Sequence, residues 1–130
     1  MNAASEARAQ VRLALSELYL DRPLPELLRG VLPELAAAPF TLDELRTILV
    51  DEVHPAVWTN LLASAGVWEG FDPAWLQARI ARNLARPRWR RARGLLLRGH
   101  ALALWRVMER RIVKLRAQAV SSGGNTQALH

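Results

Sequence analysis

Residues 41–49 read TLDELRTIL, and this stretch indicates a helical fold. The Thr41 side chain can accept a hydrogen bond from the backbone N–H of Glu44, and the Glu44 side chain can bond back to the N–H of Thr41. This reciprocal pattern, a capping box, is typical of a helix N-terminus. Apolar residues follow at helical spacing: Leu42, Leu45, Ile48 and Leu49. The stretch therefore predicts a helix that opens at Thr41 and ends near Pro55.

Two further helices are predicted before this one. Ser5 is a suitable N-cap for a first helix that runs to about Leu20. A second helix has Pro25 in its first turn and ends at Pro39. Pro33 lies inside that run, so we expect a kink or a split there, because proline removes a backbone donor.

The remaining helices follow on the C-terminal side. A short helix is expected over residues 57–64, and Asp72-Pro73 is a second start signal, for a helix that Pro87 interrupts. The last helix is the longest. Its core-facing stripe comprises Leu97, Ala101, Leu104, Trp105, Met108, Ile112 and Leu115. Its basic residues lie off that stripe: Arg98, Arg106, Arg110, Lys114 and Arg116.

The expected fold is all-α: a compact single-domain bundle of about five to six helices, the last of them long and basic. No long stretch alternates with period two, and β-branched residues are sparse. We expect one shared core that includes Leu45, Ile48, Leu76, Ile80, Leu104 and Met108. Residues 1–120 form the predicted domain. Residues 121–130, SSGGNTQALH, have little to bury and are predicted to be a disordered tail.

Composition limits the class of protein. The chain has no cysteine, which excludes disulfides, thiolate metal sites and thiol nucleophiles. The first residues lack the apolar core of a secretory signal. The longest uncharged stretch, Val53 to Trp68, is too short for a transmembrane segment. These observations predict a cytoplasmic protein.

The net charge of +6 conceals a strong asymmetry along the chain. Residues 1–76 hold eleven acidic residues and five arginines, a net charge of −6, whereas residues 77–130 hold thirteen basic residues and one acid, a net charge of +12. Such a division suggests either an anionic partner for the C-terminal part or a basic helix that folds over an acidic body.

Several stretches resemble a known family. They are ALSELYLD (14–21), APFTLDELRTILVDEVHP (38–55) and NLLASAGVWEGFDPAWLQARI (60–80). Together they are similar to a family of short bacterial proteins described only as a domain of unknown function. The resemblance covers roughly residues 11–80. It implies a small helical bacterial cytosolic protein, and it implies no activity.

The sequence offers little for catalysis. Asp51, Glu52 and His54 come nearest to an acid–base cluster, but only Asp51 and His54 share a helix face. We interpret them as a solvated helix end, with His54 near the negative end of the dipole. The three histidines are widely spaced and form no metal motif. We therefore expect no enzyme, no metal and no cofactor.

Two stretches are candidate binding sites. Trp68, Phe71 and Trp75 flank two glycines, and such aromatics form either a partner surface or a plug that seals the core. The second stretch, ARPRWRRARG (85–94), places five arginines around one tryptophan. Its candidate contacts with an anion or nucleic acid are Arg86, Arg88, Trp89, Arg90, Arg91 and Arg93. The same pattern suits a membrane surface, or a solvated linker partly neutralised by the acidic half.

The function expected from the sequence is a non-enzymatic protein-interaction domain that acts through a protein partner or by self-association. The first alternative is binding of nucleic acid or an anionic surface, through the Arg86–Arg93 segment and the outer face of the last helix. A second alternative is an immunity or inhibitor protein for a bacterial toxin, which only the small size and helical character support.

Overall fold

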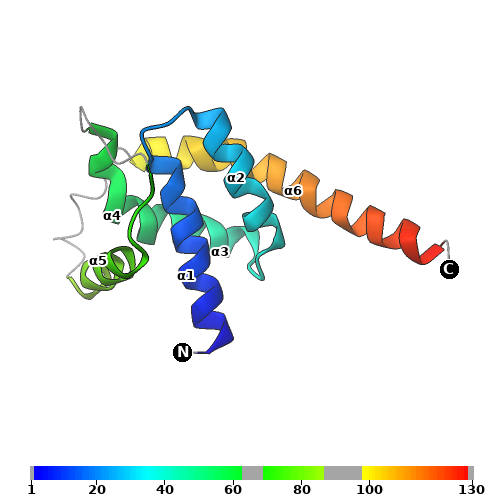
Figure 1. The fold of residues 1–130 in the computed structure, drawn as a ribbon, viewed down its shortest axis with the longest axis horizontal. Helices are drawn as coiled ribbons and strands as arrows, with labels where there is room; N and C mark the ends of the chain where they lie inside the picture. The colour runs from blue at the N-terminus through cyan, green and yellow to red at the C-terminus, as the bar shows by residue number, and fades with distance from the viewer. Residues whose placement is uncertain (1, 63–68, 87–97, 129–130) are drawn as a thin grey trace.

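The computed structural model describes residues 2–62, 69–86 and 98–128 (Figure 1). All regular structure within these ranges is helical, so the predicted all-α fold is confirmed. The elements are α1 (Ala3–Ser16), η1 (Glu17–Tyr19), α2 (Leu24–Ala37), α3 (Leu42–Thr47), η2 (Ile48–Val53), α4 (His54–Val57), η3 (Trp58–Leu62), α5 (Pro73–Ala85) and α6 (Arg98–Ala128).

The start of α1 differs from the prediction. Asn2, rather than Ser5, is the N-cap, and its side-chain oxygen accepts a hydrogen bond of 2.8 Å from the Ser5 backbone N–H. Asparagine and serine are comparable caps, so composition alone does not decide between them. The helix tightens into the short 3₁₀ segment η1, which places Tyr19 in the core.

Helix α2 continues through Pro33 without a break. Of the kink or split expected there, the split is therefore wrong and the kink stays a prediction. The proline ring leaves the carbonyl of Arg29 without its helical donor, but both residues are exposed, so water can bond to that carbonyl. The helix keeps its apolar face on the core: Leu27, Leu28, Val31, Leu32 and Leu35.

The capping box at Thr41 is confirmed, but the helical run that it opens does not end near Pro55. The run passes from α3 into the π-helical segment η2, and then through α4 and η3 to Leu62. Pro55 falls in the first turn of α4, directly after η2. The proline follows directly on the π-helical segment, where the hydrogen-bond ladder of the helix is already irregular, so the helical run continues past it.

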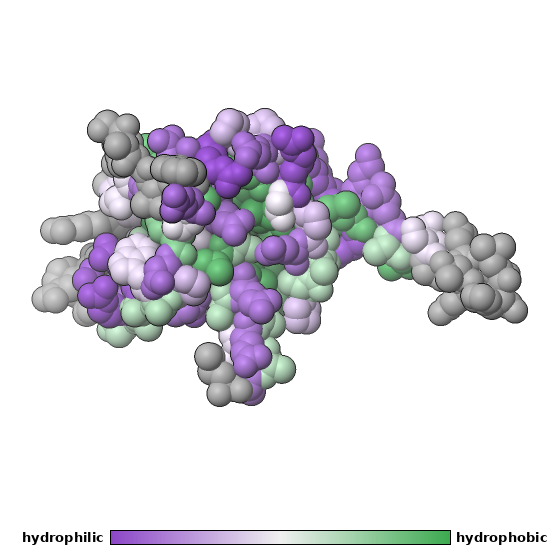
Figure 2. Space-filling model, in the orientation of Figure 1, coloured by the Kyte–Doolittle hydropathy of each residue, from purple (hydrophilic) through white to green (hydrophobic). Residues whose placement is uncertain are grey.

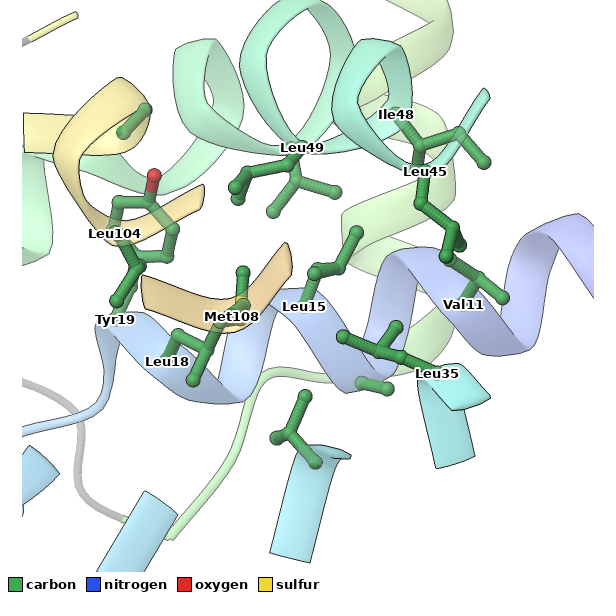
Figure 3. Close-up of a cluster of buried hydrophobic side chains, with 14 of the residues drawn as sticks. Val11, Leu15, Leu18, Tyr19, Leu35, Leu45, Ile48, Leu49, Leu104 and Met108 are labelled. Carbon is green, nitrogen blue, oxygen red and sulfur yellow. The ribbon is translucent and has the colours of Figure 1, made fainter. Parts of the chain in front are cut away.

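A single hydrophobic core joins the helices, and it contains all six residues predicted to share it. Figure 3 shows Leu15 on α1 and Leu49 on η2 facing each other, with Met108 of α6 beside them. Ala101, Leu104, Trp105, Met108 and Ile112 are buried and Leu115 is partly buried, as the α6 stripe predicts, whereas Leu97 lies outside the described residues.

Helix α6 packs against α2 and then extends away from the rest of the fold (Figure 1). It runs to Ala128, through residues that the sequence predicts to be a disordered tail. Their disorder in solution stays a prediction. The outer side of α5 and residues 117–122 of α6 lie outside the core.

Candidate functional site

Helix α5 begins and ends as the sequence predicts. The Asp72 carboxylate accepts a hydrogen bond of 2.9 Å from the Trp75 backbone N–H, and Pro73 occupies the first turn. The helix ends at Ala85, with Arg86 as its C-cap. Leu76 and Ile80 are fully buried against the core. This anchoring fixes which α5 side chains face outward.

Three residues of α5 and its C-cap form one line, which we call the α5 stripe: Trp75, Arg79, Arg82 and Arg86. Their spacing of four, three and four residues keeps them within about 60° around the helix axis and spreads them over about 16 Å. Trp75 is 41% exposed, Arg82 and Arg86 are exposed, and Arg79 is half-buried. The stripe thus combines one accessible indole with three guanidinium groups.

The arginines of the α5 stripe are not neutralised by carboxylates of the described fold. The ion pairs found among the described residues join Arg8 and Arg12 to Glu52, and Arg22 to Glu26. All of them lie within the acidic first part of the chain. The Nε atom of Arg79 is buried and has no hydrogen-bond partner there. A basic third that folds over an acidic body would pair these charges, and among the described residues no carboxylate pairs with the α5 stripe.

A stacked aromatic pair stands at the N-terminal end of the stripe. The rings of Phe71 and Trp75 lie 5.9 Å apart between centroids and 15° from parallel. Phe71 packs against the core, which holds the pair in place, and Gly70 enters this turn with a φ of 142° that favours glycine. The pair borders a hollow of about 420 Å³, whose other lining residues are Ala56, Val57, Thr59, Asn60, Gly70 and Asp72.

The described members of the two candidate sites lie at opposite ends of α5. Phe71 and Trp75 lie at its start, and Arg86, exposed, lies at its end, where the arginine-rich segment begins. The remaining candidates lie outside the described residues: Trp68, Arg88, Trp89, Arg90, Arg91 and Arg93. Sequence reasoning missed Arg79 and Arg82, although their helical spacing from Trp75 could have identified them.

The interpretation of residues 51–54 as a solvated helix end is wrong. Asp51 is exposed, but Glu52 is 5% exposed and His54 is fully buried. The chain stays helical beyond Pro55, so this segment lies in the interior. The Tyr19 hydroxyl lies 2.8 Å from His54 Nδ1, and burial raises the pKa of Tyr19. The pair joins η1 to α4 inside the core.

Glu52 of η2 belongs to a hydrogen-bond network that links η2 to α1 and α5. Its carboxylate accepts hydrogen bonds from Arg8 and Arg12, the latter at 2.8 Å. Arg12 also donates to the Gln77 side chain at 3.0 Å, and Gln77 donates to the carbonyl of Ala9 at 3.2 Å. Because Gln77 belongs to α5, this network orients the stripe relative to α1.

Neither a metal site nor a membrane-spanning helix is found among the described residues. They contain no group of three or more histidine, cysteine, aspartate or glutamate side chains placed to hold a metal ion. Among them, no helix combines the length and apolar character that crossing a membrane requires.

The fold and the α5 stripe define a small all-helical protein with an aromatic and arginine-rich face. The chain belongs to the family described as Domain of unknown function (DUF7079), whose model matches residues 6–118. The match includes all of α5 and the part of α6 that packs on the core. No curated protein and no solved structure matched the chain.

Proposed function

We propose that this protein is a non-enzymatic binding domain that binds single-stranded nucleic acid through the α5 stripe. The observation that carries the proposal is one exposed indole in line with three guanidinium groups that make no ion pair in the described part of the chain. The stripe contains one residue from each of the two binding stretches that the sequence offers as separate sites, Trp75 and Arg86.

Each part of the stripe has a physical role in such binding. Arg79, Arg82 and Arg86 would contact backbone phosphates, which releases counterions from the nucleic acid. The indole of Trp75 would stack on a base, a contact worth about 1–3 kcal/mol. Phe71 stacks on the Trp75 ring and packs against the core. The indole is therefore already held in place, and little conformational entropy is lost when a base stacks on it.

Single strands suit this face better than duplexes. A base inside a duplex is already stacked on its neighbours, whereas an unpaired base is free to stack on an aromatic side chain. The stripe offers arginines and one ring but no set of side chains that read base edges. Binding is therefore expected to depend weakly on sequence and strongly on salt.

The buried polar residues support a binding role over a catalytic one. Glu52 bonds to two arginines, and His54 lies against the Tyr19 hydroxyl, so both act within the core. We assign the protein-interaction role expected from the sequence to a different surface, formed by α1 and α2. No observation favours an inhibitor of a toxin.

Fluorescence anisotropy with labelled oligo(dT) and oligo(U) tests the proposal directly. Trp75→Ala is expected to weaken binding about tenfold or more through loss of stacking, and Trp75→Phe to recover part of the loss. Arg82→Ala is expected to reduce the slope of log K against log salt by about 0.7, the value for one phosphate contact on a single strand.

The matched control is Arg29→Ala on α2. Arg29 is exposed and lies off the stripe, and its removal changes the net charge by the same amount. If Arg29→Ala weakens binding as much as Arg82→Ala, the oligonucleotide is attracted only by the net charge of the protein. The proposal that it binds at the α5 stripe is then wrong. Absence of oligonucleotide binding at low salt would exclude the proposal. Tighter binding to phosphatidylserine vesicles than to oligonucleotides would replace it with a membrane-surface role.

A further inference from the structure

A cleft of about 590 Å³ lies between α1 and α2. Figure 2 shows hydrophobic surface where these two helices face the viewer. The apolar residues that line the cleft are Ala7, Val11, Leu13, Ala14, Leu35, Ala37, Ala38 and Pro39. The polar lining residues are Gln10, Glu17 and Glu34. The cleft therefore has a mainly apolar wall and carries two carboxylates, those of Glu17 and Glu34.

The two carboxylates of the cleft are not neutralised. Burial raises the pKa of the Glu17 carboxyl, and the nearby charge of Glu34 raises it further, while Arg22 has a smaller opposite effect. Neither glutamate makes an ion pair with another described residue. An occupant with an apolar side and positive charge would relieve this repulsion and cover the apolar wall.

The far part of α6 has the complementary composition. We call residues 110–120 the α6 arm. Val113, Ala117 and Val120 recur at helical spacing on one side of it, and the two valines are 48% and 76% exposed. Arg110 and Lys114 lie beside them, exposed, with no ion pair to the described fold. The α6 arm thus offers apolar contact flanked by cations.

Within its own chain, the apolar side of the α6 arm is not covered by the cleft, since Val113 and Val120 are exposed. Arg116 is bonded to backbone carbonyls at the C-terminal end of α2, and every residue from Ala117 to Ser122 is exposed. Figure 1 shows this part of α6 leading away from α1. The apolar side of the α6 arm and the cleft are therefore both uncovered in one chain, and a second copy can bring them together.

We propose that the occupant of the α1–α2 cleft is the α6 arm of a second copy of this chain. Val113 and Val120 would pack on the apolar wall, and Arg110 and Lys114 would approach Glu17 and Glu34. This is docking of an amphipathic helix into a groove. The surface is separate from the α5 stripe, so the inference stands independently of nucleic-acid binding.

Sedimentation of the full chain without nucleic acid, over a wide concentration range, tests the contact. The unchanged protein is expected to self-associate, and more weakly at high salt. A cleft variant, Glu17→Lys with Glu34→Lys, and an arm variant, Arg110→Glu with Lys114→Glu, are each expected to raise the dissociation constant at least tenfold. Mixed in equal amounts, they are expected to associate again, because the acidic arm of one fits the basic cleft of the other.

Control variants and other outcomes make the test decisive. Asp51→Lys and Arg98→Glu are exposed changes outside both surfaces and should leave association unchanged. Circular dichroism checks that each variant is folded. The proposal is overturned if the unchanged protein stays monomeric, if the variants associate as before, or if the mixture stays monomeric. Oligonucleotide binding by a monomeric wild-type protein would reject self-association and leave the α5 proposal standing.

Discussion

The guanidinium of Arg116 donates a hydrogen bond of 2.8 Å to the backbone carbonyl oxygen of Phe40, 76 positions earlier in the chain. The same group donates to carbonyls at and just beyond the end of α2, those of Leu35, Ala36 and Ala38. Carbonyls at a helix C-terminus have no partner within the helix and carry the negative end of its dipole. Arg116 therefore caps α2 from α6.

We predict that Arg116→Ala lowers the free energy of unfolding by about 2–3 kcal/mol, because several partly buried carbonyls lose a charged donor. Arg116→Lys should recover only part of the loss, since an ammonium group cannot match the planar fork of a guanidinium. Urea denaturation measures both changes. Arg106→Ala, an exposed change on the same helix, is the control and should shift stability by less than about 0.5 kcal/mol.

Glu52 and Asp51 are neighbours in sequence with opposite environments. Glu52 is 5% exposed and bonds to Arg8 and Arg12, whereas Asp51 is exposed. Glu52→Gln is predicted to destabilise the fold by about 2–3 kcal/mol, because it breaks a buried ion cluster from one side. Asp51→Asn should have almost no effect. Equal denaturation midpoints for the two variants would contradict the prediction that the Glu52 ion cluster stabilises the fold.

Local signals in the sequence were sufficient for most of the fold. The capping box at Thr41 identified the start of α3, and proline positions identified those of α2 and α5, while helical spacing identified the core residues of α6. These features depend on residues within one or two turns of each other. They can therefore be recognised without knowledge of the tertiary structure.

Features that depend on distant parts of the chain were missed. Pro55 indicates a helix end, but the π-helical turn before it lets the helix continue. Continuation buries Glu52 and His54, whose partners Arg8 and Tyr19 are more than thirty residues away. The α5 stripe is an intermediate case, because its spacing is visible in the sequence but its lack of carboxylate partners is not.

The capping box provides a third prediction. Thr41 accepts a hydrogen bond of 3.1 Å from the Glu44 backbone N–H, and Glu44 accepts one of 3.2 Å from the Thr41 N–H. Thr41→Ala is expected to cost about 1 kcal/mol of stability. Thr47→Ala, an exposed threonine in the same helical run with no capping bond, is the matched control. A similar denaturation midpoint for both variants would show that the cap is not needed.

The last prediction concerns alkaline pH. Tyr19 is the single tyrosine of the chain, and burial raises its pKa above the ordinary value of about 10. The unfolded chain releases this proton near pH 10 while the folded protein retains it, so the unfolded state binds fewer protons above that pH. Stability from this group is therefore fully present below about pH 10 and falls as the pH rises further.

Ultraviolet absorbance of tyrosinate measures the ionisation directly, because no other side chain of this type is present. The folded protein is expected to show no tyrosinate near pH 10, and its appearance at higher pH should coincide with unfolding. Tyr19→Phe should lower stability at neutral pH by about 1 kcal/mol, since it removes the hydroxyl 2.8 Å from His54. It should also reduce the alkaline decline. Titration of Tyr19 near pH 10 in a protein that stays folded would contradict its burial beside His54.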